Sequence, residues 1–186
     1  SNQKIVQERY RGNMLRAISH DLRTPLSGII GTSEMLMDMT QKDNKLYSLA
    51  KGINKEACWL FSLVENILNL TRLQDGKLAL RKQREAVEEV VGSAVSHVIR
   101  RYPEREITVH VPDELLLVPM DAKLIEQVLI NLLENAVKHT SEEQEISISV
   151  TEDKQKNDVV FTVADRGEGI DPDDLPNIFQ MFYTSS

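Results

Sequence analysis

Residues 46–73 read LYSLAKGINKEACWLFSLVENILNLTRL, and their large apolar residues recur every three or four positions. Only Glu56 interrupts the heptad pattern, whose apolar members are Leu46, Leu49, Ile53, Leu60, Leu63, Ile67 and Leu70. This spacing places the apolar side chains along one stripe of a helix, where they can pack against another helix. The stretch therefore predicts a long amphipathic helix.

A second helix is predicted upstream, from residue 14 onward, because apolar residues recur there at helical spacing too. Its stripe contains Leu15, Ile18, Leu22, Ile29 and Leu36. Pro25 lies inside this pattern, so we expect the helix to be locally disturbed there. The polar stretch 40–45 would join the two helices into an antiparallel hairpin.

The apolar stripes are too broad for one hairpin to cover, because Ala57, Val64 and Leu73 flank the second stripe. Two hairpins paired into a four-helix bundle would bury both stripes. We therefore expect the chain to form a homodimer.

The pattern changes at Gln74–Gly76, where the heptad ends at a turn-forming glycine. We place the domain boundary there, between residues 1–76 and 77–186. Apolar alternation begins at Leu78 and Leu80, and the segments beyond predict a mixed α/β module. The expected elements are a helix over 86–101, a strand over 107–111, a helix from the N-cap Asp121 to about residue 139, and an antiparallel strand pair over 146–151 and 159–163.

Composition excludes several classes of protein. Of the 186 residues 41% are hydrophobic and 27% are charged, which is typical of a folded globular chain. The net charge of −7 offers no general basic surface for nucleic acid. The single cysteine, Cys58, excludes an internal disulfide and favours a reducing, cytoplasmic setting. No long apolar run in this portion predicts a membrane span.

The first motif with chemical potential is Ser19–Leu26, SHDLRTPL. His20 lies between two stripe residues, so its side chain should point toward water, with Thr24 on the same face. A neutral imidazole is a competent nucleophile, and the Asp21 carboxylate can stabilise the cation that develops on it. For an isolated His–Asp pair, a surface helix without function is the alternative.

The second motif is NLLENAVKH, residues 131–139, in the helix predicted after Asp121. Asn131, Asn135 and Lys138 fall within one narrow sector of that helix. An amide oxygen suits Mg²⁺ and an ammonium group suits phosphate, so this stripe could hold a metal-bound triphosphate. A polar helix face that meets only water is the alternative.

The third motif is DRGEGI, residues 165–170, at the end of a predicted strand. Gly167 and Gly169 permit positive φ and close backbone approach, while Asp165 can accept a hydrogen bond from an exocyclic amine such as that of adenine. An ordinary loop is the alternative. The aromatic pair in FQMFY, residues 179–183, is interpreted as core or as a loop anchor.

Taken in this order, the four segments resemble the H, N, G1 and F boxes of sensor histidine kinases, over nearly the whole chain. The resemblance implies a dimerisation and histidine-phosphotransfer domain followed by a Bergerat-type ATP-binding domain with an α/β sandwich fold. In that family a second glycine-rich box and further strands follow the F box. We therefore expect that the C-terminal part of the ATP-binding domain is missing from residues 77–186.

By this resemblance His20 is the phosphorylated residue, Asp21 its acid-base partner, and Thr24 the residue that positions water when the regulator is dephosphorylated. The residues implied for the nucleotide are Asn135 as the Mg²⁺ ligand, Asn131 and Lys138 at the phosphates, His139 close by, Asp165 at the adenine amino group, and Gly167 and Gly169 shaping the pocket.

The implied function is ATP-dependent autophosphorylation on His20, followed by transfer to an aspartate of a response regulator receiver domain. Two alternatives stay open: a non-catalytic dimeric scaffold or regulator phosphatase that still binds ATP, and an unrelated Bergerat ATPase. No nucleic-acid partner is expected. We expect the parent protein to be attached to a membrane through regions outside this sequence, with this portion in the cytoplasm.

Overall fold

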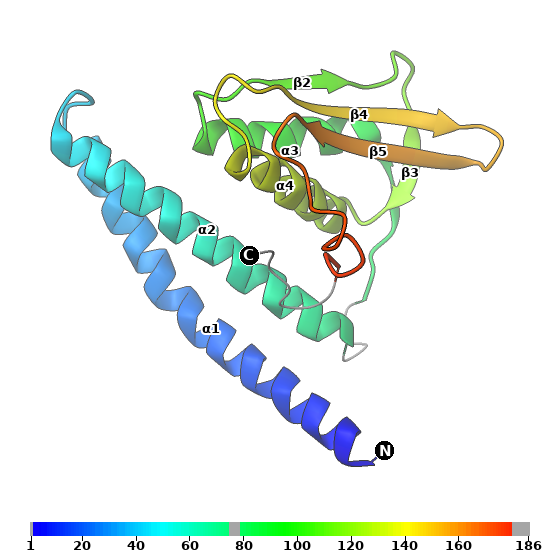
Figure 1. The fold of residues 1–186 in the computed structure, drawn as a ribbon, viewed down its shortest axis with the longest axis horizontal. Helices are drawn as coiled ribbons and strands as arrows, with labels where there is room; N and C mark the ends of the chain where they lie inside the picture. The colour runs from blue at the N-terminus through cyan, green and yellow to red at the C-terminus, as the bar shows by residue number, and fades with distance from the viewer. Residues whose placement is uncertain (1, 75–78, 180–186) are drawn as a thin grey trace. The chain divides into compact units, whose positions relative to one another are not determined.

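The chain folds into two compact units, residues 1–80 and 81–186. The computed structural model describes residues 2–74 and 79–179 (Figure 1). The predicted boundary at residue 76 and the predicted alternation at Leu78 lie outside the described residues. No helix of the part of the chain that is described is long and apolar enough to cross a membrane.

The first unit is an antiparallel pair of long helices, as the heptad pattern predicts (Figure 1). Helix α1 spans Asn2–Asp38 and helix α2 spans Lys45–Gln74. Pro25 lies inside α1, and the helix continues through it. At the start of α2 the Asn44 side chain accepts a hydrogen bond from the backbone N–H of Leu46 at 2.9 Å, which satisfies a donor that the helix leaves open.

The two helices meet through small side chains and only a few large ones. Leu26, Val64 and Leu68 form an apolar cluster with Phe61 against it. The other buried side chains of this unit are Ser19, Ser33, Ala50, Ala57 and Thr71. Two of the buried hydroxyls bond to the main chain: Ser33 donates to Ile30 O at 2.7 Å, and Thr71 donates to Leu68 O at 2.8 Å.

The predicted apolar stripes do not face each other inside the hairpin. Ile18 and Leu22 of α1 are 44% and 45% exposed, and Leu60 of α2 is 45% exposed. The flanking residues Ala57 and Val64 are buried instead. The hairpin therefore buries the flanks of the stripes and leaves their centres uncovered in the single chain.

The second unit contains two small sheets. Strand β1 (Gln83–Ala86) pairs antiparallel with β3 (Leu117–Met120). In the other sheet, β4 (Ile146–Asp153) lies between β2 (Ile107–His110), which runs parallel to it, and β5 (Asp158–Asp165), which runs antiparallel. The sequence predicts β2, β4 and β5. It misses β1 and β3, and residues 79–80 are not part of a strand.

Helices α3 (Val87–Arg101) and α4 (Ala122–Lys138) lie on one face of the three-stranded sheet (Figure 1). Their apolar sides pack against β4, and the most deeply buried residues are Val87, Val91, Val98, Leu133, Ile146 and Ile148. Asp121 caps α4 as predicted, accepting from the N–H of Leu124 at 3.4 Å. The predicted fold class, a helical hairpin followed by an α/β domain, is confirmed.

One histidine of α3 makes the stability of this unit depend on pH. Burial lowers the pKa of His97, the charges of Arg101 and Arg100 lower it further, and Glu126 opposes them. As pH falls through the ordinary histidine pKa of about 6.5, the unfolded chain gains a proton that the folded chain resists, so the free energy of unfolding decreases. We expect His97→Gln to lose less stability than the unaltered chain between about pH 7.5 and about pH 5.5 in urea titrations. An equal loss in both proteins would contradict this assignment.

Candidate functional site

His20 stands on the outer surface of α1. Its side chain is 76% exposed, and its Nδ1 lies 3.5 Å from Oδ1 of Asp21, whose side chain is 84% exposed. Thr24, one turn further along α1, is exposed as well. The structure therefore places the imidazole in water beside one carboxylate, as the sequence predicts.

The helical turn after His20 is fixed to α2 by an ion pair. Arg23 Nε donates to Glu65 Oε1 at 2.7 Å, and its terminal nitrogen lies 2.5 Å from the same oxygen. Both side chains are partly buried between the helices, and the buried Ser19 and Leu26 flank the turn on the same side. These contacts set the rotation of α1 about its axis, and His20 then lies on the flank of the helix, where it is exposed. The partners are 42 residues apart, so no local sequence signal predicts the pair.

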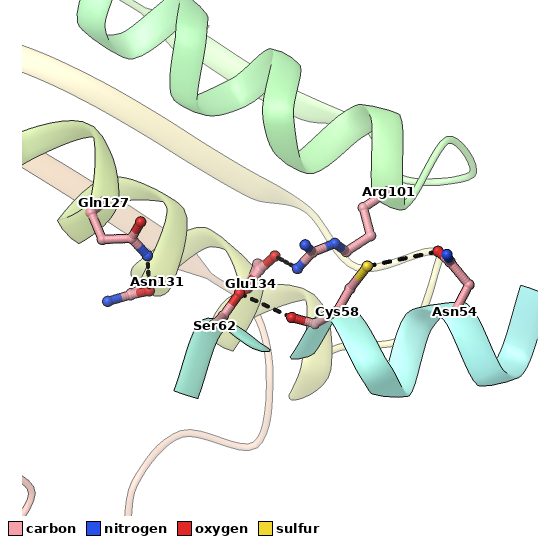
Figure 2. A network of polar contacts seen from close by, with 7 residues as sticks. All are labelled: Asn54, Cys58, Ser62, Arg101, Gln127, Asn131 and Glu134. Carbon is pink, nitrogen blue, oxygen red and sulfur yellow. Dashed lines mark hydrogen bonds and ion pairs between the residues drawn. The ribbon is translucent and has the colours of Figure 1, made fainter. Parts of the chain in front are cut away.

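The second candidate cluster lies on α4. Asn135 and Lys138 are exposed, while Asn131 is partly buried and its Oδ1 accepts from Gln127 Nε2 at 3.0 Å (Figure 2). His139 follows the helix as its C-cap, with its N–H bonded to Asn135 O at 3.1 Å. One helix and its terminus thus position all four residues that the second motif names.

The buried side of the same helix is tied to α3. Arg101 and Glu134 form an ion pair in which the side chains are 15% and 6% exposed (Figure 2). Burial raises the pKa of Glu134, and the neighbouring Arg101 guanidinium acts in the opposite direction. Glu134 precedes Asn135 in sequence but turns inward, so the ion pair anchors α4 while the Asn135 amide stays exposed. Sequence periodicity misses it, since Arg101 belongs to another helix.

The loop after β5 packs against the end of α4. A Cβ atom on Gly167 would lie 2.5 Å from the main-chain oxygen of His139, so no larger residue fits without movement. Gly169 has φ of 77°, a left-handed conformation that glycine adopts without strain. Asp165 Oδ1 accepts from the N–H of Gly167 at 2.8 Å, which holds the exposed carboxylate in one orientation. The second and third motifs are therefore adjacent in space.

The fourth motif is described only at its first residue. Phe179 is 97% exposed, and residues 180–183 lie outside the described residues. The interpretation of Phe179 as a core residue is therefore wrong for this structure, whereas that of Phe182 stays a prediction.

The oxygen ligands available at α4 suit a single metal ion that takes most of its coordination from a bound nucleotide and water. Within residues 2–74 and 79–179, no three His, Cys, Asp or Glu side chains come together as a metal cage. The exposed Asn135 amide offers a hard, neutral oxygen. Mg²⁺ is commonly held by one or two protein oxygens together with phosphates and water, so these residues fit Mg²⁺ bound to a nucleotide.

An exposed histidine on a helical hairpin, followed by an α/β unit with these loops, defines a phosphoacceptor domain joined to an ATPase domain. Residues 10–76 match the model of the His kinase A (phospho-acceptor) domain. Residues 120–186 match the model of histidine kinase-, DNA gyrase B- and HSP90-like ATPases. The chain belongs to the sensor histidine kinases of two-component systems, and its second unit is a nucleotide-binding domain of this family.

Individual relatives agree with this assignment. The sensor protein KdpD of Clostridium acetobutylicum is 42% identical over 187 residues, which cover 100% of this chain and 21% of that protein. The crystal structure of full-length ShkA in complex with AMPPNP is 28% identical, with a TM-score of 0.58 over 87% of this chain and 35% of that one.

The crystal structure of the histidine kinase ThkA in complex with the response regulator protein TrrA shares the fold. Its TM-score is 0.57 at 24% identity, over 96% of this chain and 53% of that one. The chain thus spans only part of the length of each of these proteins.

Proposed function

We propose that this chain transfers the γ-phosphoryl group of ATP to His20 and then to an aspartate of a response regulator. The observation that carries the proposal is the 76% exposure of the His20 side chain beside Asp21, on a chain that also holds a nucleotide-binding domain. A histidine that served packing would be buried, and His20 is not.

The geometry at His20 supports distinct roles for its two ring nitrogens. In this proposal Nδ1, which lies 3.5 Å from the Asp21 carboxylate, holds the proton, and the lone pair of Nε2 is left for attack. A nitrogen–phosphorus bond forms as the bond between the γ-phosphorus and the bridging oxygen breaks, and ADP departs. Asp21 stabilises the imidazolium that results and can accept its Nδ1 proton.

The residues of the second unit supply binding and charge neutralisation. In this proposal Asn135 is the protein ligand of Mg²⁺, and Lys138 and Asn131 contact phosphate oxygens, with His139 near the nucleotide. Magnesium supplies charge neutralisation at the phosphates, as phosphoryl transfer generally requires. The Asp165 carboxylate accepts a hydrogen bond from the adenine amino group. The N–H of Gly167, which donates to Asp165 Oδ1, holds the carboxylate in one orientation and so supports that role. Gly169 allows the backbone beside the base to turn.

The proposed partner is the receiver domain of a response regulator. A histidine kinase of the same fold was crystallised in complex with a response regulator protein, as reported above. Thr24 is exposed on the His20 face of α1, and this placement supports a second activity in which Thr24 positions water to dephosphorylate the regulator. Attachment of the full-length protein to a membrane, with this portion in the cytoplasm, is part of the same proposal.

Labelling tests the proposal directly. Incubation with Mg²⁺ and ATP labelled in the γ-phosphoryl group should give a protein-bound label that is stable in alkali and lost in acid, as a phosphoramidate is. Nucleotide binding without any such label, in this chain and in the full-length protein, would instead favour the scaffold.

The uncovered stripes of the hairpin support a homodimer. Leu60 is 45% exposed on α2, and Ile18 and Leu22 are exposed to the same extent on α1. Exposed apolar stripes of this length normally pack against another helix pair. A second copy of the hairpin supplies a stripe of matching length, which completes a four-helix bundle.

We expect Leu60→Glu to raise the dimer dissociation constant about a hundredfold or more, because the bundle would bury an unpaired carboxylate. The helix content of the hairpin should be kept, since Leu60 is 45% exposed in the single chain. The melting temperature should fall, because the variant loses the stabilisation that dimerisation gives the folded state. Sedimentation at micromolar concentration measures the effect. Ser48→Glu is the matched control, because it adds the same charge to α2 outside the stripe and should leave the dimer intact. An unaltered chain that sediments as a monomer would contradict the homodimer.

A further inference from the structure

One arginine that lies outside the four motifs in the sequence is buried in the second unit. Arg105, in the connection between α3 and β2, is 4% exposed. Its guanidinium donates to Ser141 O, to Thr140 Oγ1 and to Gln144 O, the last at 3.3 Å. All three acceptors belong to the loop between α4 and β4. A planar guanidinium with several donors fixes such a loop more rigidly than a single flexible donor can.

Gln144 carries this constraint from the loop to the third motif. Its Oε1 accepts from the N–H of Ser141 at 2.7 Å, which keeps the amide in place within the loop. Its Nε2 donates to the main-chain oxygen of Arg166 at 2.7 Å. The Gln144 amide thus connects the loop held by Arg105 to the turn after β5.

The peptide unit that Gln144 holds is the one that orients Asp165. The carbonyl of Arg166 and the N–H of Gly167 belong to one planar peptide group, so fixing the oxygen also fixes the N–H. That N–H donates to Asp165 Oδ1 at 2.8 Å. On its other side the same turn rests against the main-chain oxygen of His139. Rotation of this peptide would release the Asp165 carboxylate.

We infer that Arg105 and Gln144 are positioning residues for recognition of the adenine base. They act through the 166–167 peptide and do not touch the nucleotide. The inference rests on the proposed role of Asp165 in the nucleotide site. It adds a specific mechanism for selectivity, because a carboxylate held in one orientation can accept from the amino group of adenine, whereas guanine presents a carbonyl oxygen at that position.

The test compares Mg²⁺-ATP with Mg²⁺-GTP binding in the full-length protein, by titration calorimetry. We expect Gln144→Ala to weaken ATP binding about tenfold and GTP binding much less, so that the ATP/GTP affinity ratio narrows about tenfold. The melting temperature of the nucleotide-free protein should change little, because Gln144 is only partly buried. Glu142→Ala is the matched control, an exposed position on the same loop, and should leave the ratio unchanged.

Arg105→Lys tests whether a positive charge at this position is enough to hold the loop between α4 and β4. A lysine keeps the charge but lacks the several planar N–H donors of the guanidinium, so the ATP/GTP affinity ratio should fall here too. Adding Gln144→Ala to this variant should lower the ratio little further, because both residues act through the same peptide group. Equal weakening of ATP and GTP binding by Gln144→Ala would show a merely structural role and overturn the inference.

Asp165→Ala separates failure of the inference from failure of the proposed nucleotide site. If Asp165→Ala narrows the ratio and Gln144→Ala does not, the positioning role is wrong while the proposed adenine contact stands. If Asp165→Ala leaves the ratio unchanged, the adenine contact is wrong and the inference falls with it.

Discussion

Replacing His20 with alanine is expected to abolish acid-labile phosphorylation of this chain, down to the background of the assay, while Mg²⁺-ATP binding stays at the unaltered affinity. The loss should be complete because the nucleophilic nitrogen itself is removed. The fold should be unaffected, since the His20 side chain is 76% exposed and its described contact is with Asp21, which is exposed as well.

A matched control guards against a general effect of removing a histidine. His110 lies exposed on β2 of the nucleotide-binding domain, outside the proposed site. His110→Ala should therefore keep both the label and nucleotide binding. Label of undiminished strength in His20→Ala would show that another residue accepts the phosphoryl group.

Replacing Gly167 with alanine is expected to weaken ATP binding by about tenfold or more. The added Cβ would lie 2.5 Å from the main-chain oxygen of His139 and 3.0 Å from Asp165 Oδ1. The first of these atoms belongs to the backbone, so either the turn after β5 or the end of α4 has to move. Both segments carry residues of the proposed nucleotide site, so movement of either one separates Asp165 from the helix that bears Asn135.

The control for Gly167→Ala is Gly92→Ala, on the exposed side of α3. A Cβ at Gly92 meets nothing within 4 Å. Alanine within a helix is favoured over glycine by about 0.5–1 kcal/mol, so this variant should be slightly more stable and should bind ATP normally. Nucleotide titrations with thermal melts on both variants measure the two effects. Unaltered ATP affinity in Gly167→Ala would contradict the placement of the nucleotide site at this turn.

Long elements with one dominant period could be predicted from the sequence. Helix α2 follows its heptad, and α4 begins after the Asp121 cap and ends at Lys138, one residue before the predicted end. Strands β1 and β3 could not be predicted in this way. Each has four residues, β1 reads QREA with polar side chains, and β3 contains Pro119, so their pairing depends on tertiary contacts.

The interior of the hairpin does not consist of the large apolar stripe residues, as the heptad pattern alone would suggest. The sequence emphasised its large apolar residues, yet α1 meets α2 through small residues such as Ser19, Ser33 and Ala57. Small side chains let two helices approach closely, and stripe residues such as Ile18, Leu22 and Leu60 then remain exposed at the margin. Periodicity identifies an apolar stripe but does not say which partner covers it.

In the candidate site, the sequence singled out the residues whose type is chemically distinctive. His20 is exposed as predicted, and Gly167 does make a close backbone contact, though with the chain's own His139 carbonyl. The contacts that hold these residues in place could not be predicted, because Arg105 reaches a loop 35 or more residues away and Arg101 reaches Glu134 over 33 residues.

Localising the phosphoryl group by mass spectrometry, under alkaline conditions that preserve phosphohistidine, tests the central claim most directly. After incubation of the full-length protein with Mg²⁺ and ATP, the added phosphoryl mass should map to His20. Its attachment to a different residue, or its complete absence while ATP is bound, would contradict the assignment of His20 as the phosphoacceptor.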